Sequence, residues 1–264
     1  MLRVVTLNLW NLAGDWRRRR AAVIWWLQRL DPDVVCLQEV VDDGSRNTAG
    51  WLAERLELAG VAFGGVRVGG DGSSTQFGPA IVSRWPIDIK KAYVLPNSPG
   101  PTDVERVLLH ARTGGLDVFS VHLTSLYESG ALREQQCIEI DRVVASCVDP
   151  SSPLPPVLAG DFNAEPDSAE VRFLCGLGSL DGRSTYWQDA WRVAGEDGPG
   201  WTWDNRNVFA AAEFEPNRRI DYVFVGWRRD SGAGRVESCR VVCDRAVDGV
   251  FPSDHYGVLA EIAT

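Results

Sequence analysis

The sequence lacks several features that would assign a function at once. Among its 264 residues only three are histidine, and the formal net charge is −9. No Gly-x-Ser-x-Gly motif, no phosphate-binding P-loop and no Cys-x-x-Cys pair occurs, so no nucleophilic serine, cysteine or lysine stands out. The acidic excess gives no bulk attraction to nucleic acid or to an anionic membrane, although a divalent cation or a local basic rim can still dominate where a phosphate binds.

The cysteines and apolar runs indicate where the protein works. No apolar run reaches the ~18 residues that a membrane span needs, so we expect no membrane insertion. Residues 1–8 have the pattern of a strand, which leaves no room for a signal peptide. The cysteines lie mostly inside apolar runs and are interpreted as small buried hydrophobes. They are Cys36, Cys137, Cys147, Cys175, Cys239 and Cys243. We therefore expect a cytoplasmic monomer without disulfides.

Short β-branched runs alternate with helical patterns along the chain. The runs predict strands over 2–8, 33–38, 61–68, 79–84, 87–94, 106–112, 116–122, 156–160, 220–225, 235–243 and 257–262. The helical pattern predicts helices over 17–30, 47–58, 131–147, 168–175 and near 189–193. The glycine-rich stretch 64–72 opens no helix and is interpreted as a mobile loop. This order indicates an α/β fold with two mixed, largely antiparallel sheets packed face to face and helices outside, in one domain over residues 1–264.

Polar residues interrupt the apolar pattern at the ends of strands. They are Asn8, Glu39, His122, Asp161, Asn163, Asp221, Asp254 and His255. Ligand sites collect at strand ends in α/β sheets, because the body of a strand is committed to packing. We therefore expect these side chains to form one site.

The residue types in this set agree on one chemistry. Carboxylates and Asn amides offer the hard oxygen ligands that Mg²⁺ prefers, and two of the three histidines belong to the set. A site of this kind can polarise a phosphoryl oxygen, orient a water molecule and stabilise the leaving oxygen. The set therefore indicates metal-assisted attack on a phosphoester.

Six motifs carry a resemblance to a known family. In chain order they are Thr-Leu-Asn-Leu-Trp, Cys-Leu-Gln-Glu-Val, Ser-Val-His-Leu, Ala-Gly-Asp-Phe-Asn-Ala-Glu-Pro-Asp-Ser, Arg-Ile-Asp-Tyr-Val-Phe and Ser-Asp-His-Tyr-Gly-Val. Together they resemble the endonuclease/exonuclease/phosphatase superfamily, of the deoxyribonuclease I type, from Asn8 to His255. The resemblance implies a four-layer αββα sandwich. It also implies hydrolysis of a phosphoester by in-line attack of an activated water, with Mg²⁺ or alternatively Mn²⁺ as cofactor.

The resemblance assigns a metal site to three of these positions. Glu39 would be the main Mg²⁺ ligand, Asn8 would lie near the metal and the phosphate, and Asp254 would be a further carboxylate at the metal. Accounts of the family differ on which carboxylates touch the metal and on which group is the base.

The resemblance also assigns the catalytic roles. Asp161 would orient or deprotonate the attacking water, and Asn163 would hold the phosphoryl oxygens. His255 would contact the scissile phosphate, with Asp221 fixing its tautomer and charge. His122 would be a second phosphate contact.

The substrate stays open at this stage. The preferred interpretation is a phosphodiesterase acting on nucleic acid, either a nuclease or a DNA-end-processing enzyme. The alternatives are a sphingomyelinase-like enzyme acting on phospholipid, an inositol-phosphate phosphatase and a catalytically silent phosphate-binding module. Trp10 stands where apurinic endonucleases carry an acidic residue, which argues against that branch. The stretch 201–205 is closer to tyrosyl-DNA phosphodiesterase 2 and to sphingomyelinases.

Several residues near the motifs are candidate substrate contacts. Trp10 and Trp203 flank motif loops and could stack on a base or a lipid head region, and Asn205 lies in the same stretch as Trp203. Arg106 matches a frequent family arginine, and we leave open a phosphate contact or a buried ion pair. The run of arginines at 17–20 is interpreted as a solvated helix face, or alternatively as a rim that attracts a polyanion. The pair Arg133 and Gln136 is assigned to packing, or alternatively to substrate contact.

Overall fold

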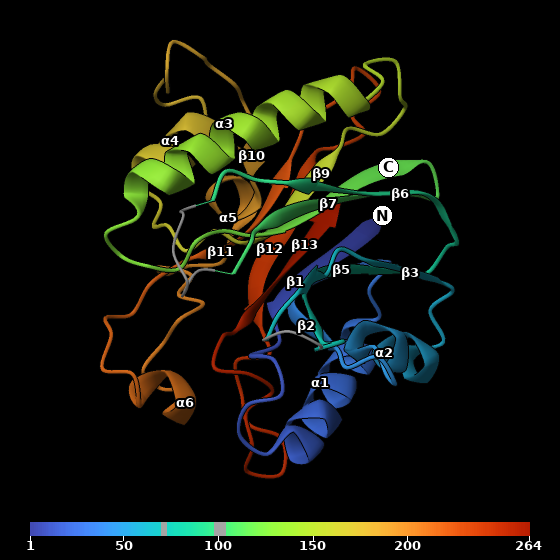
Figure 1. The fold of residues 1–264 in the computed structure, drawn as a ribbon. Coiled ribbons are helices and arrows are strands. Elements are labelled where there is room, and N and C mark those ends of the chain that lie inside the picture. Colours follow the sequence, from blue (N-terminus) through green and yellow to red (C-terminus); the bar gives the residue numbers. More distant parts are fainter. Residues whose placement is uncertain (70–72, 98–103) are drawn as a thin grey trace.

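The structure, a computed structural model, describes residues 1–69, 73–97 and 104–264 (Figure 1). Two mixed β-sheets pack face to face, and helices cover the outer face of each sheet. This confirms the predicted four-layer αββα sandwich. The predicted strands 2–8, 87–94, 116–122 and 257–262 have the observed bounds, and the five predicted helices match observed ones to within two residues at either end.

The first sheet is formed by both ends of the chain. Its strands are β1 (Leu2–Asn8), β2 (Val34–Asp42), β3 (Gly60–Phe63), β4 (Val66–Arg67), β5 (Gln76–Ser83), β12 (Val236–Val242) and β13 (Gly257–Ile262). They lie in the order β12-β13-β1-β2-β5-β3, and β4 pairs with the end of β5. The helices α1 (Trp16–Leu30) and α2 (Thr48–Leu56) cover its outer face.

The second sheet comes from the middle of the chain. Its strands are β6 (Ile87–Val94), β7 (Val107–Thr113), β8 (Leu116–His122), β9 (Val157–Asp161), β10 (Gln188–Asp189) and β11 (Asp221–Val225), in the order β10-β11-β9-β8-β7-β6. The helices α3 (Gly130–Cys147) and α4 (Ala169–Leu174) cover its outer face. Two short helices, α5 (Ala190–Ala194) and α6 (Val208–Ala211), lie in the connection from β10 to β11.

The apolar core is divided into three layers because successive residues of a strand point to opposite faces. In β1, Val4 packs between the two sheets while Val5 packs against α1. Leu27 of α1 and Ile140 of α3 belong to the two outer layers. Each sheet is therefore buried on both faces, and the free ends of its strands are left for polar side chains.

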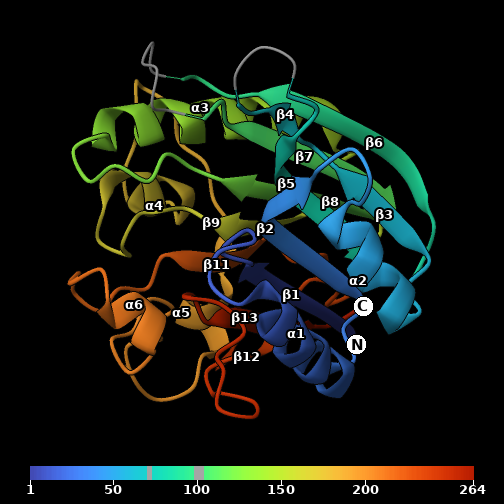
Figure 2. The ribbon, with the colours of Figure 1, turned by 60° about the horizontal axis from the view of Figure 1, so that its bottom comes forward.

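Each sheet contains one parallel strand pair joined by a helical crossover. These are β1-α1-β2 and β8-α3-β9, which place both helices on the outside (Figure 2). In the first pair Asn8 lies opposite Gln38, and in the second His122 lies opposite Asp161. Both pairs therefore reach the same end of the sandwich, where Asn8, His122 and Asp161 end their strands.

Some predicted elements were wrong in extent. The strand predicted over 61–68 is broken into β3 and β4, because the backbone at Gly64 crosses Gly78 so closely that a Cβ on Gly78 would lie 2.4 Å from the Gly64 carbonyl oxygen. The predicted loop 64–72 thus contains β4, and its residues 70–72 lie outside the described residues. The short elements β10 and α6 were not predicted, since two to four residues carry too little periodicity.

The described residues also bear on membrane-spanning helices and on the state of the cysteines. No helix there is long and apolar enough to cross a membrane. All six cysteines carry free thiols, and five of them are buried, as their apolar surroundings predicted.

The close approach of β8 and β9 beside the site gives a test of the fold. Gly160 has φ +154°, and a Cβ there would lie 2.0 Å from the Val121 carbonyl oxygen. We expect Gly160→Ala to lower the free energy of unfolding by about 3 kcal/mol, because the two backbones must separate. Gly178→Ala is the control, since no atom lies within 4 Å of its added Cβ. Urea denaturation measures both, and equal stabilities would contradict the packing described.

Candidate active site

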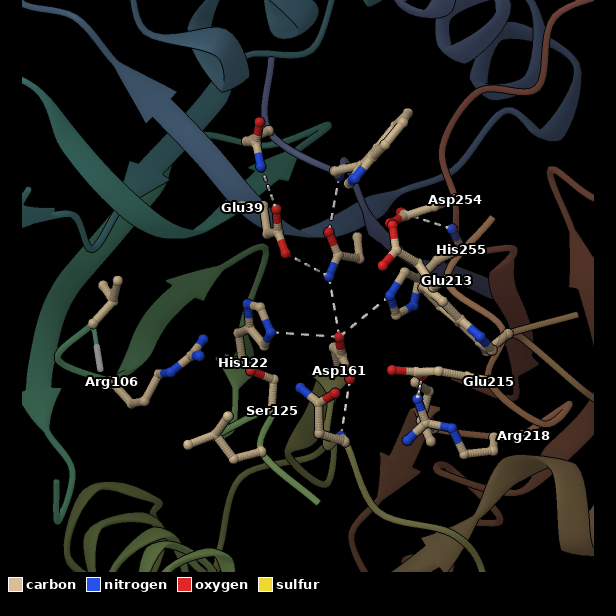
Figure 3. A pocket seen from close by; sticks show the side chains of 18 of the residues that line it. Glu39, Arg106, His122, Ser125, Asp161, Glu213, Glu215, Arg218, Asp254 and His255 are labelled. Carbon is tan, nitrogen blue, oxygen red and sulfur yellow. Dashed lines mark hydrogen bonds and ion pairs between the residues drawn. The ribbon is translucent and has the colours of Figure 1, made fainter. Parts of the chain in front are cut away.

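The ends of the two parallel strand pairs open into one cavity of about 520 Å³ (Figure 3). Seven of the eight predicted strand-end residues line it, and the eighth, Asp221, lies behind His255. The seven are Asn8, Glu39, His122, Asp161, Asn163, Asp254 and His255. Residues that are up to 247 positions apart in the chain are thus brought together at one end of the sandwich.

The Asn8 side chain joins the two sheets at the floor of the cavity. Its amide nitrogen donates to Glu39 Oε1 at 3.3 Å and to Asp161 Oδ2 at 3.0 Å, while its oxygen accepts from the Trp10 backbone N–H at 2.9 Å. Asn11, which sequence analysis missed, donates to Glu39 Oε2 at 2.9 Å. Glu39 is therefore held between two amides at the edge of the site.

Glu39 owes its direction to an irregularity in β2. The register between β2 and β5 shifts between Leu37 and Val40, and Glu39 has a φ of +56°, in the left-handed region that L-residues rarely occupy. The bulge turns the Glu39 carboxylate into the cavity instead of onto a sheet face. Trp10, Asn11 and Asn163 also have φ between 40° and 52°. Four residues that line the cavity thus have unfavourable backbone conformations, which cluster at functional sites.

Asp254 supplies the second carboxylate on the Glu39 side of the cavity. Its Oδ1 accepts from the Ser253 hydroxyl and the His255 backbone N–H, both at 3.0 Å, and among the described residues its Oδ2 accepts no hydrogen bond. Burial, together with the nearby Glu39 carboxylate, raises the pKa of Asp254 to about 6. The two carboxylates form a hard oxygen donor set that suits Mg²⁺ or Mn²⁺.

A second cluster of possible metal ligands consists of Asp161, Asp221 and His255, which have ligand atoms within 4.8 Å of one another. The Nδ1 atom of His255 is 2.9 Å from Asp221 Oδ2, and its Nε2 is 3.8 Å from Asp161 Oδ2. Burial lowers the pKa of His255, but Asp221 and Asp161 outweigh this effect and raise it to about 10. Because Nδ1 of His255 is paired with Asp221 and its Nε2 faces Asp161, these three residues have the arrangement of an acid–base group.

Asp161 occupies the centre of the cavity between the two histidines (Figure 3). His122 Nε2 lies 3.5 Å from its Oδ2, and the Asn163 backbone N–H donates to its Oδ1 at 2.9 Å. Burial and the neighbouring Asp221 carboxylate raise the pKa of Asp161. Asn163 itself is fixed by donating its side-chain amide to the Leu123 carbonyl oxygen at 3.1 Å.

The two histidines differ in charge. Burial, with Arg106 and His255 nearby, holds the pKa of His122 well below its usual range, so its ring is neutral. His255 is cationic for the reasons given above. The cavity therefore presents one neutral and one charged imidazole on opposite sides of one carboxylate.

Arg19 holds together the two loops that carry the Glu39 side of the site. Its side chain is 0% exposed and donates six hydrogen bonds to the carbonyl oxygens of Leu9, Trp10, Asn11, Ala13 and Pro252. The interpretation of Arg17–Arg20 as a solvated face or a polyanion rim is therefore wrong for Arg19. Burial lowers its pKa to about 10, which leaves it charged at neutral pH.

The segment 202–207 supports the His255 side of the site. The Thr202 hydroxyl accepts from the backbone N–H groups of Ile220 and Asp221, both at 3.1 Å. Asn207 donates to the carbonyl oxygens of Ser253 and Asp254 at 2.8 and 3.0 Å. Thr202 and Asn207 fix the backbone around Asp221 and Asp254, and sequence analysis missed both.

Three of the four candidate substrate contacts line the cavity, and the fourth does not. Trp10 and Arg106 line the cavity, and so does Trp203, although it is only 6% exposed and its ring contacts His255 at 5.0 Å. Asn205 does not line the cavity; it donates to the Glu215 carbonyl oxygen at 2.8 Å and lies outside the group.

The loop after β8 forms a further wall of the cavity, which Ser125 and Leu126 line. Buried Arg133 donates to the carbonyl oxygens of Thr124, Leu126 and Tyr127 and pairs with Glu170 at 2.9 Å. Gln136 donates to the Thr124 hydroxyl at 3.0 Å. Both residues hold this loop in place, in agreement with the packing alternative and not with substrate contact.

Among the supporting residues that sequence analysis missed, Arg19 had the clearest signal in the sequence. Arg19 falls four residues before Val23 and eight before Leu27, on the apolar face of α1, so its position predicted burial. Asn207 and Arg218 lie in a segment without regular periodicity, and their positions follow from contacts with distant residues, Asn207 with the backbone at Ser253 and Asp254 and Arg218 with Tyr127.

Comparison with known proteins agrees with this geometry. Residues 5–255 match the model of the Endonuclease/Exonuclease/phosphatase family. Protein angel of Drosophila melanogaster is 29% identical over 173 residues, which are 61% of this chain and 48% of that protein. This chain thus spans about half the length of that curated relative.

Solved structures share the fold over essentially the whole chain. Truncated TDP2 of Caenorhabditis elegans matches with a TM-score of 0.70 and 21% identity, covering 100% of this chain and 97% of that one. An endonuclease/exonuclease/phosphatase of Beutenbergia cavernae matches with a TM-score of 0.69 and 26% identity, covering 99% of this chain and 71% of that one. The family match therefore covers all the residues that form the cavity, and the chain belongs to the endonuclease/exonuclease/phosphatase family, whose members are metal-dependent phosphoesterases.

Proposed function

We propose that the protein is a Mg²⁺-dependent phosphodiesterase that acts on nucleic acid, as a nuclease or a DNA-end-processing enzyme. The observation that carries the proposal is Asp161, which lies between two imidazoles and faces the Glu39 and Asp254 carboxylates across Asn8. A carboxylate for the water, donors for the phosphate and oxygen ligands for a cation are thereby in one cavity.

The cation would be held by Glu39 and Asp254, with Asn8 adjacent. When bound, it supplies Lewis-acid polarisation of a phosphoryl oxygen and neutralises charge on the substrate. Either Mg²⁺ or Mn²⁺ suits these oxygen donors, and Mg²⁺ is the proposed one.

Asp161 orients the attacking water and accepts its proton. Its Oδ1 is fixed by the Asn163 N–H and its Oδ2 by the Asn8 amide, so its direction is set before substrate binds. The ring N–H groups of His122 and His255 and the side-chain amide of Asn163 line the same space and donate to the phosphoryl oxygens as charge develops. The ester oxygen opposite the water then leaves in line and takes a proton from solvent water to become the alcohol.

The side chains of the cavity walls favour a substrate that has aromatic groups beside its phosphate. Trp10 and Phe77 line the cavity, and Phe214, which lies between the lining residues Glu213 and Glu215 in the sequence, is 94% exposed. Aromatic side chains stack on nucleic-acid bases without regard to sequence, at ~1–3 kcal/mol per base. A nucleotide next to the scissile phosphate fits these walls.

A specific observation favours phospholipid as a second candidate. Leu126 lines the cavity and is 49% exposed, and Tyr127 and Phe214, each next in sequence to a lining residue, are 54% and 94% exposed. Exposed apolar side chains of this kind could enter a lipid surface. Co-sedimentation with sphingomyelin vesicles and release of phosphocholine would support this candidate over nucleic acid.

Replacing the central carboxylates tests the proposed chemistry. We expect Asp161→Asn and Glu39→Gln each to lower cleavage of end-labelled DNA by about 10³-fold with Mg²⁺, because proton acceptance and cation binding are lost. The exposed Asp167, in the same loop as Asp161, supplies the control Asp167→Asn. A gel assay of single-stranded and duplex DNA with Mg²⁺, Mn²⁺ or chelator measures the rates. Undiminished cleavage by either site variant, or cleavage in chelator, would contradict the proposal.

A substitution at Arg19 tests whether the loops after β1 and before β13 must be held in place for cation binding. Arg19→Lys keeps the charge but loses the planar fork that serves five carbonyl groups, so we expect about 2–4 kcal/mol lower stability. We also expect about tenfold weaker Mg²⁺ affinity, because Glu39 and Asp254 lose their fixed separation. Urea denaturation and titration calorimetry measure the two effects. Exposed Arg17→Lys on the same helix is the control, and identical behaviour of the two variants would refute this role.

A further inference from the structure

The two flanks of the cavity differ in their side chains. In Figure 3, Arg106 lies on the His122 side, and Glu213, Glu215 and Arg218 lie on the His255 side, with Asp161 between the two groups. A phosphodiester has two ester groups, so one of them must extend over each flank when the phosphate is at the centre.

The His255 flank has a net negative charge. Arg218 is 6% exposed, pairs with Glu215 and stacks on Tyr127 at 4.5 Å, so its charge is already compensated. Glu213 is exposed, and within the described ranges it forms no ion pair. One uncompensated carboxylate therefore faces the substrate on this flank.

This carboxylate affects where a nucleic-acid strand can continue. Phosphates follow one another closely along a strand, about 3.4 Å of helix axis apart. A strand that continued over the His255 flank would bring its next phosphate beside Glu213, and like charges at such separations repel. A group without a phosphate meets no such repulsion.

The residue that follows Glu213 in the chain is a strongly exposed aromatic residue. Phe214 follows Glu213 at a loop tip with φ +59° and is 94% exposed. A non-glycine residue in this conformation is strained, and an exposed phenylalanine has no packing that would offset the strain. An uncharged or aromatic group on the substrate would gain contact there.

We infer that Glu213 is a specificity-determining residue that rejects substrates with a second phosphate on the His255 flank. The inference rests on the proposed phosphodiester hydrolysis and narrows it. The enzyme then acts on a terminal phosphodiester, whose group on this flank ends without a further phosphate. Internal bonds of a continuing strand are poor substrates, and so are inositol phosphates with several phosphate groups.

Three dinucleotides test this inference with the full-length chain and Mg²⁺. They are dTpdT, pdTpdT with an added 5′-phosphate, and dTpdTp with an added 3′-phosphate. Whichever way the substrate lies, one of the added phosphates falls on the Glu213 flank. We expect that one phosphorylated dinucleotide is cleaved with about tenfold lower kcat/KM than dTpdT, and that the penalty shrinks in high salt.

Variants assign this penalty to Glu213. We expect Glu213→Gln to raise kcat/KM for the disfavoured dinucleotide about fivefold relative to that for dTpdT, and Glu213→Lys to raise this ratio further. Exposed Glu54→Gln on α2 changes the net charge equally and should leave the ratio unaltered.

The outcomes separate this inference from the proposed function. Equal cleavage of all three dinucleotides by the wild type, an unchanged ratio in Glu213→Gln, or an equal change in Glu54→Gln would overturn the role of Glu213. Each of these leaves the phosphodiesterase proposal standing. Failure of the wild type to cleave even dTpdT would instead overturn the phosphodiesterase proposal and this inference together.

Discussion

The buried guanidinium of Arg19 is the interaction on which the site most depends. Trp10 and Asn11 follow β1 with left-handed backbones, and the hydrogen bond from the Ala13 N–H to the Trp10 carbonyl oxygen leaves other carbonyl groups of this loop without backbone donors in the described part of the chain. Arg19 supplies the missing donors, and by also binding the Pro252 carbonyl it connects the loop after β1 to the loop before β13. Burying a charge is costly unless it is fully hydrogen-bonded, and five carbonyl acceptors meet that condition here.

The position of the site follows from the topology. A parallel strand pair needs a crossover helix, and two such units placed face to face leave their helices on opposite outer surfaces. The carboxyl ends of β1 and β2 then face those of β8 and β9, because Asn8 and His122 hold equivalent places in their pairs. Asn8 closes the gap between the sheets with its hydrogen bonds to Glu39 and Asp161. The floor of the cavity is therefore as rigid as the sandwich itself.

The same reasoning explains what the sequence could predict. Strands and their polar ends were readable because β-branched, apolar runs stop abruptly at residues such as Asn8 and His122, and the layered fold follows from the order of these segments. The supporting residues were not readable. In Asn205-Arg206-Asn207, the sequence favours neither asparagine, yet only Asn207 reaches the backbone at Asp254, 47 positions away. Arg19 was misassigned because four successive arginines resemble a solvated helix face, although its position on the apolar side of α1 predicted burial.

The contrast between strand ends and loops also separates the groups proposed for the chemistry from those proposed to select the substrate. The groups proposed to act on the phosphate lie at strand ends, where the sheets fix them to one another, so a family resemblance transfers their arrangement reliably. The groups proposed to contact the rest of the substrate, among them Glu213 and Leu126, lie on loops that the sheets do not constrain. Loops tolerate change without loss of the core, so their charge can differ between relatives that share every catalytic residue. The charge of the His255 flank is therefore a property of this chain, and family membership alone cannot supply it.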